Sequence, residues 1–175
     1  MNPEAVDKYI DECGLIGFDI IEISTGFITV PVDDVLRLIE KVQRSGMKAK
    51  PEVETQFGAG GTTAASELEA EGTQDIDWAV NCARRYLDAG AYMIMIESEG
   101  ITESVESWRT DVPVRFVNSL GVEKVMFEAA EPEVFQWYIK NYGRRSICSW
   151  ITVKLLSLKP CVPGSGEPRV SGVGC

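Results

Sequence analysis

The sequence predicts an α/β fold in which short strands alternate with helices. Short apolar runs alternate with longer segments whose apolar residues recur at helical spacing, and glycines close those segments. The apolar runs also lack the in–out alternation of a half-exposed strand, which is typical of strands covered on both faces. Strands joined by helices over short connections form a parallel sheet. A length of 175 residues is enough for one domain with a substantial core.

The strand signals are short and evenly spaced. The first reads FDIIEIS, a β-branched run, and the second reads MKAKPEV and is expected to end near Pro51. The third and fourth read YMIMIE and EKVMFE. The predicted strands are therefore Phe18–Ser24, Met47–Val53, Tyr92–Glu97 and Glu123–Glu128.

The helix signals lie before, between and after these strands. Asn2 can cap a first helix with Pro3 at its first position, and Gly14 and Gly17 close it. The later helices are predicted over Pro31–Ser45, Asp75–Ala89, Ile101–Leu120 and Pro132–Tyr142. We expect a break near Pro113, and one helical turn around Ser66–Glu71 inside a long loop.

The composition excludes several classes of function. A formal charge of −10 argues against nucleic acid or anionic membrane as a partner, and no apolar run approaches a membrane span of about 20 residues. The sequence has no histidine, which excludes histidine bases, Ser-His or Cys-His pairs and His-ligated metals. Five irregularly spaced cysteines and no signal region predict reduced thiols and a cytoplasmic location.

Charge divides the chain after Gly143. Residues 144–175 hold five Lys and Arg but one acid, Glu167, which leaves the first 143 residues at −14. Three cysteines and several prolines and glycines also gather in these last 32 residues. The composition from Pro160 onward predicts flexible coil, either an interaction arm or a segment that does not pack.

Each predicted strand ends in a glutamate. The four residues are Glu22, Glu52, Glu97 and Glu128, and Lys50 shares a strand face with Glu52. Sites in α/β folds form at the carboxyl ends of strands, so these side chains are expected in one mouth. Crowded carboxylates need a cation, for which Mg²⁺ is the natural candidate, and Lys50 can bind an anion or donate a proton. The alternative is that each glutamate is solvated and merely opens a loop.

Two other segments are candidates for anion binding. Backbone N–H groups of the Gly58–Thr63 loop, with Gly60 and Gly61 at its centre, could cradle a phosphate, although the loop matches no Walker or dinucleotide motif. The alternative is a mobile lid or a simple linker. Arg109, in the sequence SWRTD, is a candidate anion contact on a loop.

Four segments of residues 3–143 resemble the phosphosulfolactate synthase family. They are GFDIIEIS, the strand end Lys50-Pro51-Glu52-Val53, DAGAYMIMIESEG and EKVMFEAAEPE. The resemblance is to the eukaryotic, fungal-like branch, near plant heat-stress-associated homologues. It implies part of a (β/α)8 TIM barrel, with about four of the eight strands, and Mg²⁺-dependent addition of sulfite to phosphoenolpyruvate for coenzyme M synthesis. It further implies that Lys50, Glu52 and Glu22 are catalytic and that Glu97 and Glu128 bind the metal. Gly60, Gly61 and Arg109, the anion-binding candidates above, are expected to bind substrate.

The sequence departs from the family at both ends. It starts after the family's second strand, and after Gly143 the family reads Phe-Val-Asp-His-Ser-Gln-Ile where this chain reads Cys148 to Lys154. One nucleotide sequence encodes both in different frames, so we interpret 144–175 as a non-homologous tail from a frameshift. Genomic and transcript sequence across these codons tests this hypothesis.

Two classes of function follow from the resemblance. One is a lyase-type synthase, active in a full-length parent while this chain is inactive. The other is a non-catalytic, stress-associated binding protein of the same fold. Open strand edges also predict a homo-oligomer.

Overall fold

The computed structural model describes residues 3–25, 30–56 and 75–143. Its centre is a four-stranded sheet of β1 (Ile20–Ile23), β2 (Lys48–Val53), β3 (Ile94–Ile96) and β4 (Val125–Phe127). The spatial order is β1-β2-β3-β4, and each neighbouring pair is parallel. The predicted α/β fold with four parallel strands is confirmed.

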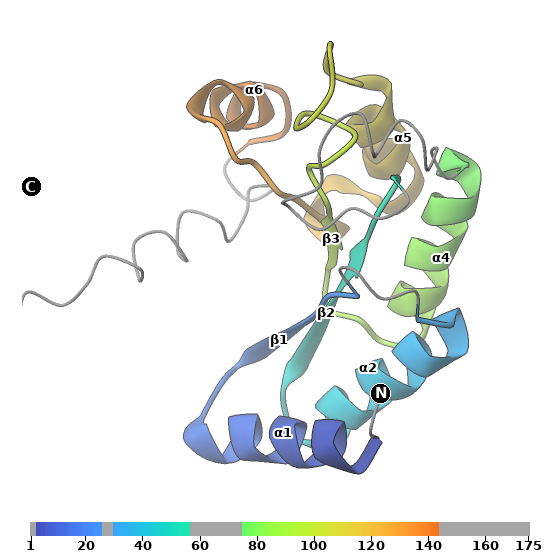
Figure 1. Cartoon of the computed structure of the whole chain (residues 1–175), viewed down its shortest axis with the longest axis vertical. Helices are drawn as coiled ribbons and strands as arrows, with labels where there is room; N and C mark the ends of the chain where they lie inside the picture. The colour runs from blue at the N-terminus through green and yellow to red at the C-terminus, as the bar shows by residue number, and fades with distance from the viewer. Residues whose placement is uncertain (1–2, 26–29, 57–74, 144–175) are drawn as a thin grey trace, which may run out of the picture.

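Three of the helices connect the strands and cover one face of the sheet. The helices are α1 (Pro3–Ile16), α2 (Val32–Arg44), α4 (Ile76–Asp88), α5 (Asp111–Leu120) and α6 (Pro132–Tyr142), with a short 3₁₀ helix, η1 (Val122–Lys124). Figure 1 shows α2, α4 and α5 in a row along the sheet. α2 contacts β1 and β2, α4 contacts β2 and β3, and α5 contacts β4. This arrangement is the crossover pattern that parallel strands require.

The two faces of the strands carry different side chains. The face toward the helices carries fully buried apolar residues, among them Ala49, Ile94 and Phe127. The opposite face carries Lys50, Met95 and Met126, and Met95 is aligned with Glu52 on β2 and with Met126 on β4. Side chains along a strand alternate between the two faces. The glutamates that lie two residues after Lys50, Met95 and Met126 are therefore on this second face as well.

One predicted helix is wrong in its first half. Residues 101–110 form turns, and α5 begins only at Asp111. The carbonyl of Ser98 accepts hydrogen bonds from the N–H groups of Ile101, Thr102 and Glu103, and Ser104 has a φ of 57°, which a right-handed helix cannot contain. Pro113 lies in the first turn of α5, where its missing N–H costs no intrahelical bond, so it breaks nothing.

Some predicted features lie outside the described residues. They are the helical turn at Ser66–Glu71, the glycine loop with Gly60 and Gly61, and the tail 144–175. Within the described ranges, the helices are too short or too polar to cross a membrane.

Candidate functional site

A lysine and a glutamate form an ion pair on the second face of the sheet. Glu22 of β1 is aligned with Lys50 of β2, and Lys50 Nζ lies 2.8 Å from Glu22 Oε2. The lysine side chain is 9% exposed and that of Glu22 is 39% exposed. Lys50 Nζ also lies 3.8 Å from Met126 Sδ on β4, so the lysine reaches across the sheet beneath the strand ends.

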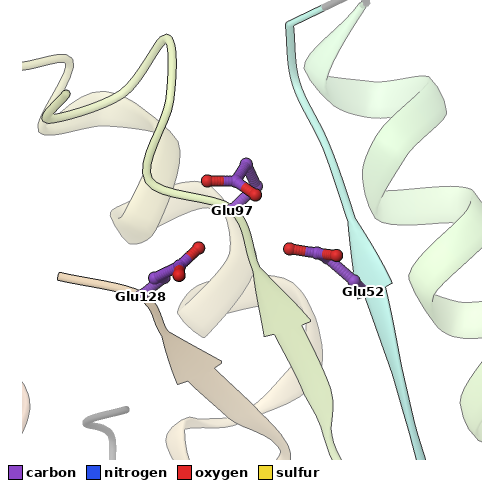
Figure 2. Close-up of side chains that lie close together, drawn as sticks. All are labelled: Glu52, Glu97 and Glu128. Carbon is purple, nitrogen blue, oxygen red and sulfur yellow. The ribbon is translucent and has the colours of Figure 1, made fainter. Parts of the chain in front are cut away.

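Three glutamates converge at the carboxyl ends of β2, β3 and β4. One carboxylate oxygen from each of Glu52, Glu97 and Glu128 lies within 4.8 Å of the others. Figure 2 shows Glu97, which follows the central strand, between Glu52 on one side and Glu128 on the other. The structure therefore brings together the sequence-predicted acids of these three strands, while Glu22 is two residues lower in the register and pairs with Lys50.

Burial, together with the neighbouring acids, raises the pKa of two of these glutamates. Burial, followed by a hydrogen bond and charge repulsion from Glu97, raises the pKa of Glu52 to about 9. Burial and the charge of Glu97 raise the pKa of Glu128 to about 8. Both effects disfavour the charged form, since a buried anion loses hydration and neighbouring anions repel it. Without a cation, the protonated forms of Glu52 and Glu128 are therefore favoured at neutral pH.

Glu97 is held by the backbone that follows it. Its Oε1 accepts hydrogen bonds from the N–H groups of Ser98 at 2.9 Å and Glu99 at 3.2 Å. The side chain of Glu97 is also within hydrogen-bonding reach of Glu52 and Glu128. Glu97 is therefore the acid that links the loop after β3 to the rest of the cluster.

Hydroxyl groups after β1 contact the acids of β2. Thr25 Oγ1 donates to Glu54 Oε1 at 3.0 Å, and Ser24 forms a side-chain hydrogen bond with Glu52. Burial raises the pKa of Glu54 to about 7, and Glu97 and Glu99 repel its charge. Glu54 was not predicted from the sequence. It lies two residues after Glu52, so the alternation of side chains along the strand places it on the same face.

Two more acids after β3 were also missed. Glu99 is 1% exposed and Glu103 is half-buried, and the two form an isolated parallel bridge. Extending the period of two past Glu97 would have found Glu99. No periodic signal indicates Glu103, because it reaches the site only through the turn of residues 98–103.

Arg109 lies on the outer surface of the fold. Its side chain pairs with Asp111 at 3.4 Å, and it lines a shallow pocket with Asp75, Asp77 and Arg115 near the first turns of α4 and α5. Among the described residues, its ion pair and the pocket that it lines do not include the glutamate cluster. The other predicted substrate ligands, Gly60 and Gly61, lie outside the described residues.

The donor set of the cluster fits a metal ion. Three carboxylate oxygens within 4.8 Å of one another are hard ligands of the kind that Mg²⁺ and Ca²⁺ prefer. Burial and the charge of neighbouring acids raise the pKa of Glu52 and Glu128, and a divalent cation would favour the ionised form of both. The cluster could therefore hold a metal ion, with Glu52, Glu97 and Glu128 as its ligands.

Comparisons with known proteins agree with this arrangement. Residues 1–148 match the family described as (2R)-phospho-3-sulfolactate synthase (ComA). The chain is 32% identical over 151 residues to the protein HEAT-STRESS-ASSOCIATED 32 of Arabidopsis thaliana, covering 81% of this chain and 53% of that protein. It is 24% identical over 146 residues to the phosphosulfolactate synthase of Methanothermobacter thermautotrophicus, covering 80% and 53%. The chain thus spans about half the length of these relatives.

Solved structures with a similar fold are TIM-barrel enzymes. The carboxyl transferase domain of Rhizobium etli pyruvate carboxylase superposes with a TM-score of 0.55 at 12% identity, covering 83% of this chain and 23% of that one. A putative phosphonomutase from Burkholderia cenocepacia gives 0.54 at 17% identity, covering 91% and 61%. At such low identity these likenesses establish only the fold, a partial TIM-barrel-like arrangement. The family match over residues 1–148 establishes more: the chain belongs to the phosphosulfolactate synthase family.

Proposed function

We propose that the glutamate cluster binds Mg²⁺ and belongs to a site that adds sulfite to phosphoenolpyruvate. The observation that carries this proposal is the convergence of Glu52, Glu97 and Glu128 above a buried lysine, in a chain of the phosphosulfolactate synthase family. A full-length parent would carry the complete activity, and this chain by itself is expected to be inactive.

The chemistry needs one new bond and one proton. The sulfite sulfur attacks C3 of phosphoenolpyruvate, the electron pair of the C2–C3 double bond moves toward the substrate carboxylate, and C2 then takes up a proton. Bound at the cluster, Mg²⁺ supplies positive charge that stabilises the negative charge developing on the substrate. Glu97 and Glu128 would hold the metal, with Glu52 in reach as a third ligand or as a proton-transfer group.

Lys50 is the proposed proton donor to C2, or the group that neutralises the substrate phosphate or carboxylate. It is buried, and its ammonium group lies on the same face as the glutamates. Glu22, in contact with Lys50 and partly exposed to solvent, would return a proton to the lysine after turnover.

The described residues explain binding of the cation better than binding of the substrate anions. Six further acids surround or approach Glu97: Glu22, Glu52, Glu54, Glu99, Glu103 and Glu128. In the described part of the chain, Lys50 is the cationic side chain that forms an ion pair with one of these acids, Glu22. The phosphate therefore needs additional donors, for which Gly60 and Gly61 stay our proposed candidates, whereas Arg109 pairs with Asp111 on the outer surface of the fold.

The experiment is an assay of sulfite consumption with phosphoenolpyruvate and Mg²⁺ in the full-length parent. We expect turnover that EDTA abolishes, and loss of at least about a hundredfold in the Glu97→Gln variant. The matched control is Glu106→Gln, which removes an exposed acid in the same loop region. Unchanged turnover in Glu97→Gln would contradict the role of the cluster.

A second proposal is a non-catalytic protein of the same fold that acts in stress tolerance. The 32% identity to a heat-stress-associated plant protein favours it. In that case the cluster still binds a divalent cation, but sulfite is not consumed in the assay above. Mg²⁺-dependent stabilisation of the parent without turnover would be the expected result.

We also propose that the chain associates with itself. Apolar side chains at the end of α1 and just before β1 are solvent-exposed, with Leu15 at 87%, Ile16 at 75% and Phe18 at 53%. An uncovered strand edge with apolar neighbours favours pairing with a second copy. Sedimentation velocity should show a species larger than the 19.3 kDa chain, and a single monomeric boundary at all concentrations would contradict the association.

A further inference from the structure

The loop after β3 folds around one serine. Ser98 is 1% exposed and follows Glu97 directly. Its carbonyl accepts the N–H groups of Ile101, Thr102 and Glu103 at 3.0, 2.9 and 3.1 Å. Its hydroxyl lies 2.8 Å from Glu103 Oε2 and 3.4 Å from Glu97 Oε1. Because a hydroxyl has one proton to donate, the shorter distance assigns that hydrogen bond to Glu103.

The same loop presents two backbone donors to Glu97. The N–H groups of Ser98 and Glu99, at the start of the turn from 98 to 103, both donate to Glu97 Oε1. Closure is fixed at the far end by the Gly100 N–H, which donates to the Glu103 carbonyl at 2.9 Å. Gly100 has a φ of 78°, and a Cβ there would lie 2.7 Å from the Cβ of Gln56, so the turn also packs closely against the segment after β2.

The turn therefore restricts how Glu97 can point. With Oε1 bound by two N–H groups, rotation of the carboxylate would break both hydrogen bonds. This restraint matters because Glu97 is the central member of the cluster, between Glu52 and Glu128 (Figure 2). Free glutamate side chains lose rotamer entropy when they bind a metal, so a ligand already held in place binds more tightly.

We propose that Ser98 is a positioning residue: its hydrogen bond to Glu103 closes the 98–103 turn, which holds Glu97 in the orientation that binds a divalent cation. This inference rests on the proposed metal role of the cluster. Ser98 touches neither substrate nor metal, and its effect passes through Glu97.

The test measures Mn²⁺ binding to the 175-residue chain, with Mn²⁺ as a paramagnetic substitute for Mg²⁺ and free Mn²⁺ read by electron paramagnetic resonance. Replacing a residue that orients a metal ligand commonly weakens metal affinity by about 10- to 100-fold. We expect a loss of about tenfold in Ser98→Ala. Ser119→Ala on α5 is the matched control and should bind like the native chain.

A pair of variants at Glu103 isolates the hydrogen bond from charge. Glu103→Gln and Glu103→Leu both remove one negative charge, but only glutamine keeps an oxygen that accepts from Ser98. We expect the leucine variant to bind Mn²⁺ several-fold more weakly than the glutamine variant. Thermal unfolding of each variant without metal provides the fold check, and a difference confined to metal affinity supports positioning rather than general stability.

The outcomes distinguish the positioning role of Ser98 from the metal-binding role of the glutamate cluster. Weak binding in Ser98→Ala and Glu103→Leu, with native-like binding in Ser119→Ala, supports the proposal. Native-like binding in Ser98→Ala and equal binding in the two Glu103 variants, while Glu97→Gln binds weakly, overturns the positioning role alone. Native-like binding in Glu97→Gln, or no binding to the native chain, overturns the metal role and the inference with it.

Discussion

The acids at the strand ends and the acids on the helices have opposite surroundings. On the helices, carboxylates meet cations: Asp77 contacts Arg115, Asp33 contacts Arg85 and Glu40 contacts Arg44, at 2.6 to 2.8 Å. These groups are more than half exposed. At the strand ends, Glu52, Glu97 and Glu128 are buried or half-buried and meet one another.

The difference shows where the fold tolerates repulsion. A surface pair adds little stability, but it also costs little, because water screens both charges. Three converging carboxylates in a partly dehydrated site oppose folding unless a proton or a cation joins them. Such an arrangement points to ligand binding rather than to stability, and it is the kind of cluster in which perturbed pKa values mark functional sites.

The largest effect of a single substitution should come from Lys50→Met, which removes the buried cation but keeps much of its volume. We expect the free energy of unfolding at neutral pH to fall by about 2 kcal/mol, less than the roughly 3–5 kcal/mol of a fully buried pair because Glu22 is partly exposed. Urea unfolding measures this change. The matched control, Lys124→Met at an exposed position, should stay within about 0.5 kcal/mol, and equal losses in the two variants would contradict the special position of Lys50.

The next effect is on the pH dependence of stability. Folded Glu52 and Glu128 have pKa values near 9 and 8, above the ordinary value of 4.5. The folded state therefore binds more protons, and the stabilisation is complete below pH 4.5 and is lost as the pH rises through about 8 and 9. We expect the free energy of unfolding, measured in EDTA, to decrease from about pH 5 to about pH 9.

A double variant identifies the groups responsible. Glu52→Gln combined with Glu128→Gln removes both titrating carboxyls and should flatten most of this decrease, with Glu54, whose pKa is about 7, accounting for a remainder. A native chain that gains stability between about pH 5 and 9 would contradict the crowding of these acids.

The smallest effect is expected on the helices. Arg115→Met removes a guanidinium that makes two contacts with Asp77 Oδ1, but both side chains are more than half exposed. The free energy of unfolding should change by less than about 0.5 kcal/mol, and less still at high salt. A loss comparable with that of Lys50→Met would remove the contrast between the two regions.

The fold and the central acids of the candidate site could be predicted from the sequence because both follow from the regular spacing of residues along strands and helices. Alternation along each strand placed Glu52, Glu97 and Glu128 on one face, and parallel strands carried them to one edge. The wrong helix over residues 101–110 had a convincing apolar spacing of Ile101, Val105 and Trp108. Backbone hydrogen bonds to the Ser98 carbonyl decided against it, and no residue period reports such bonds.

The contacts that hold the acids were also beyond the sequence. Thr25 meets Glu54 across 29 residues, because β1 and β2 are neighbours with a particular register. That register also lowers Glu22 to the level of Lys50, so the four strand-end glutamates do not form one even ring. Alternation fixes the face of a side chain but leaves its height along the sheet undetermined.

The most direct test of the cation site is a pH titration of the glutamate side-chain carboxyls by ¹³C NMR, with and without Mg²⁺. Without metal, we expect two resonances, assigned by Glu52→Gln and Glu128→Gln, to titrate far above the ordinary glutamate pKa of 4.5. Mg²⁺ should move both midpoints down by at least one unit, since a bound cation favours the ionised form. Midpoints near 4.5 without metal, or midpoints that Mg²⁺ leaves in place, would contradict a carboxylate cluster built to bind a cation.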